Sequence, residues 1–329
     1  MTLETLKPLI YIAVATLSLA FLASCGAGQR AKEAEREFPP TGQILDVDGV
    51  RIHARVEGNG PDLVLIHGAS GSTRDMAFTL LPLLKDRYRV ILFDRPGLGY
   101  SGRTDPAYEA AFTSKAESPQ EQAEVLVKAA KMLGADRPIV LGHSYGGAVA
   151  LAWATYHPEN IAGLVDVAGV ALPWPGTLGP LYQINGSALG GALVVPLISA
   201  LTPQSVVKSA INGLFEPETP PQGYADAVGA PLTLRTDTFR ANARQVNSLR
   251  PHIVEMSKDY DRLAGLPIEI IHGTADDTVP IQIHSRPLAE RLPHIRLTEI
   301  EGGSHMIHHT HPQSIIQAID RTARAAGLR

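Results

Sequence analysis

The sequence predicts an α/β domain in which helices cover both faces of a mostly parallel sheet, with a helical segment inserted late in the chain. The first observation is that short apolar runs typical of buried strands alternate with stretches of helical periodicity. The second is that this alternation stops near Leu172 and resumes near Leu263. The third is a glycine-flanked serine at residues 142–146, between an apolar run and a helix-like stretch.

The expected elements follow one another in the order that such a sheet requires. The runs expected to form strands are 43–47, 50–56, 63–66, 90–93, 138–141, 161–167, 268–271 and 296–300. Helical spacing of apolar residues marks 76–84, 123–133, 147–157, 205–214, 281–292 and 315–323. The first two strands flank Asp48-Gly49, a pair that favours a tight turn, so we expect them to form a hairpin.

The best-marked helix begins after Ser118. Ser118 and Glu121 have the spacing of a capping box, and Pro119 occupies the first helical position. Gly134 stands where the helix should end. These signals predict a helix directly before the strand that leads to the glycine-flanked serine.

Between residues 172 and 262 the chain has a different character. Prolines and glycines cluster there and interrupt shorter helical stretches. We therefore expect a helical cap at 172–262, inserted between a first core part at 41–171 and a second at 263–329. No internal repeat or low-complexity segment occurs.

The N-terminal residues form a separate unit. An uncharged run extends from Pro8 to Ser24 and ends in Leu22-Ala23-Ser24-Cys25. This tetrapeptide resembles the lipobox of bacterial lipoproteins, in which the cysteine carries the lipid; a signal anchor and a cleaved secretion signal are the alternatives. We therefore expect residues 1–25 to be a signal with a lipobox, or a membrane anchor. The polar stretch 26–40 is expected to be a tether.

The N-terminal segment indicates the compartment of the protein, and the composition limits its partners. Each alternative for the N-terminus places the rest of the chain outside the cytoplasm, in the cell envelope, and the first two attach it to a membrane. Cys25 is the only cysteine, so the folded part contains no disulfide. The net charge of -4 and the lack of a basic stripe argue against a nucleic-acid partner.

Three polar residues follow predicted strand ends in an order that suits nucleophilic catalysis. Ser144 lies in Gly142-His143-Ser144-Tyr145-Gly146, where flanking glycines permit a strained strand-to-helix turn. Asp276 and His305 each follow a later strand. Because the carboxyl ends of parallel strands meet at one edge of a sheet, we expect these side chains to lie together. A serine hydroxyl needs a base, and the base needs an acid to orient it.

These motifs resemble those of the α/β-hydrolase fold superfamily over about residues 41–329. The resemblance rests on the serine elbow, on residues 67–70 and 94–101, and on the loops that contain Asp276 and His305. It implies an α/β-hydrolase core, a mostly parallel sheet flanked by helices, with an inserted helical cap.

The resemblance also implies the roles of the site residues. Ser144 is the expected nucleophile, His305 the base and Asp276 the acid, while the backbone N–H groups of Ala69 and Tyr145 match the two oxyanion donors. Members of this superfamily that open epoxides or remove halogens use aspartate at the elbow. Serine at that position therefore argues against both of those chemistries.

Other acidic residues and histidines have competing interpretations. Asp94 is expected to organise a turn, Asp166 is an alternative acid, and Asp277 is expected to be solvated or to cap its loop. The histidines that suggest a metal cluster are His305, His308, His309 and His311. Since no further ligand pattern accompanies them, we expect no metal, with the last three mostly at the surface or supporting the site.

The expected function is hydrolysis of a carboxylic ester, or a related acyl bond, through an acyl-enzyme and without a cofactor. A peptide- or C–C-bond hydrolase, or a cofactor-free haloperoxidase or perhydrolase, would use the same triad. A non-catalytic binding protein is a further alternative, but such relatives usually lose a triad member. The uncharged stretch from Leu189 to Leu201 in the cap favours a small-molecule substrate with an apolar acyl or alcohol group.

Overall fold

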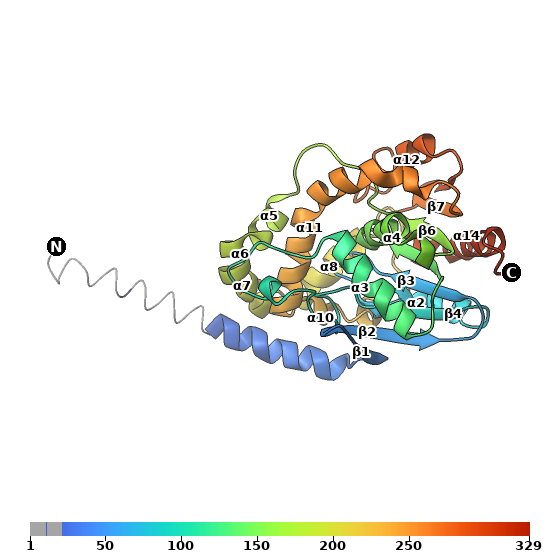
Figure 1. The fold of residues 1–329 in the computed structure, drawn as a ribbon. Coiled ribbons are helices and arrows are strands. Elements are labelled where there is room, and N and C mark those ends of the chain that lie inside the picture. Colours follow the sequence, from blue (N-terminus) through green and yellow to red (C-terminus); the bar gives the residue numbers. More distant parts are fainter. Residues whose placement is uncertain (1–10, 12–21) are drawn as a thin grey trace.

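A sheet of eight strands forms the centre of the protein (Figure 1). The structure is a computed structural model and describes Tyr11 and residues 22–329. The order of the strands is β1-β2-β4-β3-β5-β6-β7-β8; β2 is antiparallel to both of its neighbours, and the others are parallel. The strands are β1 (Gln43–Val47), β2 (Val50–Glu57), β3 (Asp62–Ile66), β4 (Arg89–Phe93), β5 (Ile139–His143), β6 (Gly163–Val167), β7 (Ile268–Gly273) and β8 (Arg296–Ile300).

Two hydrophobic clusters cover the two faces of this sheet. Successive residues of a strand point to opposite faces, so Val64 and Ile66 of β3 belong to one cluster while Leu63 and Leu65 belong to the other. The first cluster includes side chains of α3 and α4, and the second those of α2 and α14. The core helices are α2 (Thr73–Leu84), α3 (Pro119–Met132), α4 (Tyr145–Tyr156), α12 (Ser285–Arg291), α13 (Ile307–Thr310) and α14 (Pro312–Ala325). Both faces of the inner strands β3 to β7 are therefore buried, as parallel sheets require.

Helix α3 begins where its sequence signals predict. The Ser118 hydroxyl accepts a hydrogen bond from the backbone N–H of Glu121 at 3.1 Å, and the Glu121 carboxylate accepts one from the N–H of Ser118 at 2.7 Å. This reciprocal pair satisfies two N–H groups that the first helical turn leaves without partners. The capping box thus holds the helix that packs beside α4.

The inserted cap is helical and lies between β6 and β7. Its elements are α5 (Pro180–Gly186), α6 (Ala188–Leu193), α7 (Val195–Leu201), α8 (Gln204–Gly213), α9 (Tyr224–Ala227), α10 (Ala230–Thr233), α11 (Thr236–Met256) and η3 (Ser257–Leu263). Helix α11 is the longest of them, with 21 residues, and it packs against α5 and α7 of the cap as well as α4 of the core. It therefore joins cap and core, together with η3 and α9, which pack on α4 and α2.

Residues 26–40 differ from the expected tether, because the chain is helical from residue 22 to residue 37. Ala27, Ala34 and Phe38 are buried. The guanidinium of Arg30 donates hydrogen bonds to the carbonyl oxygens of Ala200 and Thr202 at 2.9 and 2.7 Å. Ala, Glu, Lys and Arg dominate this stretch and all favour helices, so a composition that suggested a linker also suits a docked helix.

Candidate active site

Ser144 occupies a strained turn between β5 and α4. Its backbone has φ 55° and ψ −119°, which few residues with a side chain adopt. A Cβ on Gly142 would collide with the carbonyl oxygen of Gly146, and a Cβ on Gly146 would collide with the carbonyl oxygen of Ile66. Glycine is therefore required on both sides of the serine, and the turn directs Ser144 beyond the end of the strand.

The carboxylate of Asp276 lies against the ring of His305. Their Oδ2 and Nδ1 atoms are 2.7 Å apart, and both side chains are buried. The other oxygen, Oδ1, accepts hydrogen bonds from the backbone N–H groups of Thr278 and Val279 at 2.9 and 2.8 Å. The loop after β7 thus holds the carboxylate in one orientation and leaves one oxygen for the histidine.

His272 is a further partner of Asp276 that the sequence interpretation missed. Its Nε2 lies 3.1 Å from Asp276 Oδ2 and 2.7 Å from the carbonyl oxygen of Val279, so it donates its proton toward two acceptors. Its Nδ1 accepts from the Ser285 hydroxyl at 2.6 Å. The position of His272 within strand β7 gave no sign of this contact, which depends on how the following loop folds back.

These contacts determine the ionisation of Asp276. Burial by itself would raise the pKa of this carboxyl, but hydrogen bonds from His272 and His305, together with the attraction of their rings, outweigh it. The pKa of Asp276 is consequently held below its ordinary value. The group is an anion at neutral pH.

His143 links the serine turn to the loop of His305. Its Nε2 donates to the carbonyl oxygen of His305 at 3.1 Å, and the two ring centroids are 4.8 Å apart. Because Ser144 directly follows His143, this bond holds the serine turn against the loop of His305. Among the described residues no hydrogen bond joins Ser144 Oγ to His305 Nε2; such bonds often tighten only when a substrate is bound.

The loop after β3 also reaches the serine. A Cβ on Gly68 would lie 3.1 Å from the Cβ of Ser144, so the backbone at residue 68 is in contact with the elbow. Within the described part of the chain, the N–H groups of Ala69 and Tyr145 donate no hydrogen bond. Two backbone donors beside Ser144 are therefore available to a ligand oxygen.

The cap supplies two residues that hold the site loops and that no sequence pattern marked. Asn242 of α11 accepts from the backbone N–H of Ser70 at 2.7 Å and donates to the Ser70 hydroxyl at 3.0 Å. Glu218 accepts from the backbone N–H of Ser304 at 2.8 Å and from the Thr310 hydroxyl at 3.0 Å. One cap residue thus fixes the loop that contains Ala69, and the other fixes the loop that contains His305.

The remaining carboxylates do not take part in the Asp276–His305 pair. Asp94 binds His53 Nδ1 and the backbone N–H groups of Thr73 and Tyr100, so it organises its turn. Burial raises the pKa of Asp166 to about 7, and neither of its oxygens has a hydrogen-bond partner in the described chain. Asp277 is exposed.

His308 and His309 are buried, so of the two expected placements, at the surface or supporting the site, the surface one is wrong for both. Asp75 Oδ1 lies 2.9 Å from His309 Nε2 and 3.7 Å from His308 Nε2, and it accepts from the Tyr224 hydroxyl at 2.7 Å. The ligand atoms of Asp75, His308 and His309 lie within 4.8 Å of one another, close enough to share a divalent cation. His311 lies apart from them and pairs with Glu218 at 2.9 Å.

Comparison with known proteins agrees with the fold. The profile of the Alpha/beta hydrolase family matches residues 63–318. An uncharacterized protein of Mycobacterium tuberculosis is 26% identical over 287 residues, which is 86% of this chain and 81% of the relative. The pimeloyl-(acyl-carrier protein) methyl ester esterase of Aeromonas hydrophila is 28% identical over 277 residues, 80% and 95% of the two chains. The crystal structure of an esterase from a Rhodococcus species superposes with a TM-score of 0.64 at 24% identity, over 88% and 99% of the chains.

Proposed function

The chain belongs to the alpha/beta hydrolase family, and we propose that within this family it is a serine hydrolase that cleaves a carboxylic ester or a related acyl bond. The observation that carries the proposal is the 2.7 Å contact between Asp276 Oδ2 and His305 Nδ1, beside a serine in a strained turn. Serine, base and oriented acid are the groups that nucleophilic acyl transfer needs. The ester-cleaving relative from Aeromonas hydrophila supports the bond type.

In the proposed mechanism His305 is the general base. Its Nε2 takes the proton of Ser144 as Oγ attacks the carbonyl carbon of the substrate, and later gives that proton to the leaving alcohol. Asp276 holds the ring with its proton on Nδ1 and stabilises the imidazolium that forms. The lowered pKa of Asp276 suits this role, because the carboxylate stays charged while the ring gains its proton.

The backbone N–H groups of Ala69 and Tyr145 would bind the oxyanion of the tetrahedral intermediate. Donors fixed in advance cost no reorganisation during the reaction, and each contributes on the order of 10²–10³ in rate. Water then attacks the acyl-enzyme, again with His305 as base, and releases the acid. Besides substrate and water, each step uses side chains and backbone groups of this chain.

We propose an apolar ester of small size as the substrate. Support comes from the cap, where the stretch between Leu189 and Leu201 carries no charged residue. Leu189, Leu193 and Leu201 of this stretch are at least half exposed, so the stretch would favour the approach of an apolar ester to the cap and not line the site around Ser144. A series of esters of increasing acyl length, compared by kcat/KM, would define the preferred length.

Labelling with a fluorophosphonate probe tests the proposed function. The probe reacts with serines that an adjacent base activates, so peptide mapping is expected to find the adduct on Ser144 and no adduct in Ser144→Ala. Ser101 and Ser304 serve as internal comparisons, because both are bound to backbone groups of their own loops. An adduct on either of these, with Ser144 unmodified, would contradict the proposal.

We further propose that the N-terminus attaches the enzyme to a membrane of the cell envelope. Cys25 is the only cysteine, and an uncharged run from Pro8 to Ser24 precedes it. Lipidation with more than one chain would give stable anchoring where a single chain would be marginal. Cys25→Ser should abolish lipid labelling and processing if Cys25 carries the lipid, while unchanged membrane retention with an unmodified N-terminus would identify an anchor instead.

A further inference from the structure

Helices α5, α6 and α7 of the cap present apolar side chains to solvent. Five large side chains are at least half exposed, and we call them the apolar cap face: Leu181, Ile184, Leu189, Leu193 and Leu201. No Asp, Glu, Lys or Arg occurs from residue 171 to residue 207. Elsewhere in the described chain, exposed large apolar residues stand on separate elements, as with Met132 on α3 and Leu83 on α2. A concentration of this kind on an uncharged segment marks an interaction surface.

The helix of residues 22–37 begins at the same end of the molecule. Arg30 binds the carbonyl oxygens of Ala200 and Thr202, where α7 ends. A Cβ on Gly26 would lie 3.6 Å from the Cβ of Ala200. Figure 1 shows that this helix begins beside α6 and α7 and continues toward β1. The uncharged run that ends at Ser24 therefore joins the described chain next to the apolar cap face.

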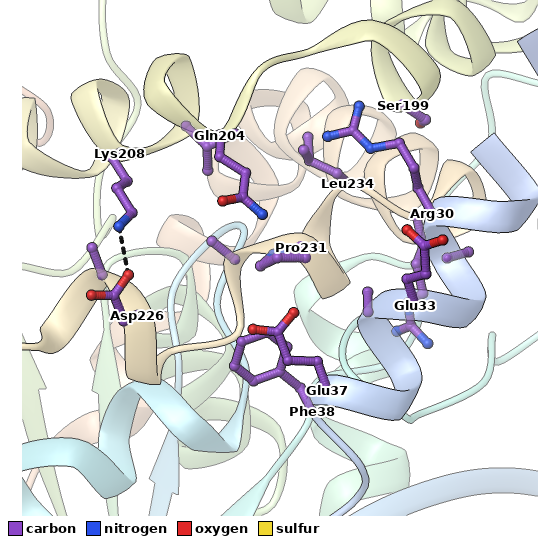
Figure 2. Close-up of a pocket in the computed structure, with 16 residues that line it drawn as sticks. Arg30, Glu33, Glu37, Phe38, Ser199, Gln204, Lys208, Asp226, Pro231 and Leu234 are labelled. Carbon is purple, nitrogen blue, oxygen red and sulfur yellow. Dashed lines mark ion pairs between the residues drawn. The ribbon is translucent and has the colours of Figure 1, made fainter. Parts of the chain in front are cut away.

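The helix meets the cap through the hydrogen bonds of Arg30 and through an apolar cluster of Ala34, Phe38 and Leu232, and it leaves the apolar cap face uncovered. A cavity of about 160 Å³ lies between the N-terminal helix and the cap. Arg30, Glu33 and Glu37 line one side of it (Figure 2). On the other side Lys208 and Asp226 form an ion pair at 2.6 Å. Leu189 remains 66% exposed and Leu201 70% exposed with the helix in place. Neither the N-terminal helix nor the core therefore supplies a partner for this face.

The short length of α5, α6 and α7 and the bend between α5 and α6 suit helices that lie on a membrane surface better than helices that cross the membrane. Among the described residues, no single helix is long and apolar enough to cross a bilayer. Helix α5 and residues 188–201 reach the required length and hydropathy only together, and the break between them bends the pair by 78°. Short apolar helices at such an angle can lie in the interface of a bilayer with one face toward the acyl chains.

We propose that the apolar cap face rests on the lipid bilayer to which the N-terminus attaches the protein. The proposal rests on the membrane attachment proposed above, and it goes further by assigning the side of the enzyme that meets the lipid. The lipid-facing part is then the cap, whose Asn242 and Glu218 hold the loops around Ser144. An apolar ester dissolved in the bilayer would meet the cap first.

Tryptophan placed on this face tests the contact directly. Full-length Leu189→Trp and Met132→Trp are compared with the parent chain in phosphatidylcholine vesicles whose acyl chains carry bromine. Met132 is the matched control, because it is 56% exposed but lies on α3 of the core. We expect bromine to quench the added fluorescence of Leu189→Trp and its emission to shift to shorter wavelength, while Met132→Trp stays unquenched.

The outcomes separate this proposal from the membrane attachment on which it rests. If the parent chain floats with the vesicles but Leu189→Trp is unquenched, the attachment stands and the proposed contact is overturned. If the parent chain does not float, both fail. If Leu189→Trp is unquenched and the full chain forms a dimer that Leu189→Glu abolishes, the face belongs to a second copy and the proposal is overturned.

Activity gives a second test. The double variant Leu189→Glu, Leu193→Glu should hydrolyse an ester embedded in vesicles about tenfold more slowly than the parent, because two carboxylates oppose entry into the apolar interface. Its rate on a water-soluble short-chain ester should not change. Met132→Glu should leave both rates unchanged. Equal loss on both substrates would show damage to the cap and contradict the proposal.

Discussion

Hydrogen-bond donors surround both oxygens of the Asp276 carboxylate. Two are backbone N–H groups, of Thr278 and Val279, and two are the rings of His305 and His272. At the residue scale this arrangement determines which oxygen faces the base and keeps the group ionised. Its exposed neighbour Asp277 has none of these partners. Two adjacent aspartates therefore differ in environment, because only one of them is enclosed by the loop.

We expect Asp276→Asn to lower kcat by about 10³- to 10⁴-fold, because an amide N–H facing His305 favours the unproductive tautomer of the ring. Asp277→Asn should keep kcat within about twofold of the parent, since changes at exposed positions rarely disturb their surroundings. Steady-state kinetics on one ester checks both variants, with circular dichroism to show that both fold. If Asp277→Asn or Asp166→Asn is the inactive variant, the assignment of the acid is wrong.

The buried histidines near Asp75 lead to a prediction about metals. Asp75 Oδ1 already accepts from Tyr224 and lies within hydrogen-bond distance of His309, and the proposed mechanism needs no cation. We therefore expect full activity after dialysis against EDTA, and no gain when Zn²⁺ is returned. A loss of activity in EDTA that Zn²⁺ reverses in the parent but not in His308→Gln would show that this cluster holds a required ion.

At the element scale, helix α11 does more than cover the site. Asn242 binds both the backbone and the hydroxyl of Ser70, and Gln245, one turn later, donates to the carbonyl oxygen of Pro96. Both contacts reach loops at the carboxyl ends of core strands. A single helix thus holds the backbone that carries Ala69, and in the proposed mechanism its polar face would affect catalysis as well as stability.

We expect Asn242→Ala to reduce kcat about tenfold with a smaller change in KM, because it frees the loop of Ala69 and leaves the N–H of Ser70 unpaired. Asn242→Asp keeps an acceptor for that N–H and should recover part of the loss. Ser248→Ala on the same helix is the control, since Ser248 bonds only within α11. The rate of fluorophosphonate labelling should follow the same order; equal rates for parent and Asn242→Ala would contradict the positioning role.

At the scale of the whole molecule, buried neutral histidines couple stability to pH. Burial, reinforced by the nearby charge of Arg95, lowers the pKa of His67 to about 4. Burial, reinforced by His309, lowers the pKa of His308 to about 4. In the unfolded chain both rings take up a proton near pH 6.5, while in the folded chain they do so only near pH 4. Between these values the unfolded state binds more protons.

We therefore expect the contribution of these two histidines to the free energy of unfolding to be constant above about pH 6.5. It should fall as the pH drops toward about 4. Melting temperatures measured between pH 8 and pH 4 check this. His308 has no hydrogen-bond partner in the described chain, so His308→Gln removes one titrating ring without breaking a bond. Its melting temperature should fall less steeply over the same range; equal slopes would show that His308 does not contribute. Asp276, whose pKa is lowered, adds a further loss at more acidic pH.

Local signals in the sequence were sufficient for much of the fold and for the order of the candidate triad. The capping box at Ser118, the apolar runs of the strands and the glycines around Ser144 each act over a few residues, so neighbouring positions alone reveal them. The register of parallel strands then brings their carboxyl ends to one edge, which is why Asp276 and His305 could be placed together before any contact was known.

Periodicity and turn chemistry are local, so the sequence alone predicts the strands, most of the core helices and the residues at the strand ends, but it did not mark the 21-residue helix α11 of the cap. That residues 26–37 form a docked helix, that His308 and His309 are buried, and that Asn242 and Glu218 hold the site loops follows from the tertiary structure alone. Asn242 lies 172 positions from Ser70 along the chain. Contacts of this kind depend on how the cap packs on the core, and no local pattern records which distant side chain will satisfy a given backbone group.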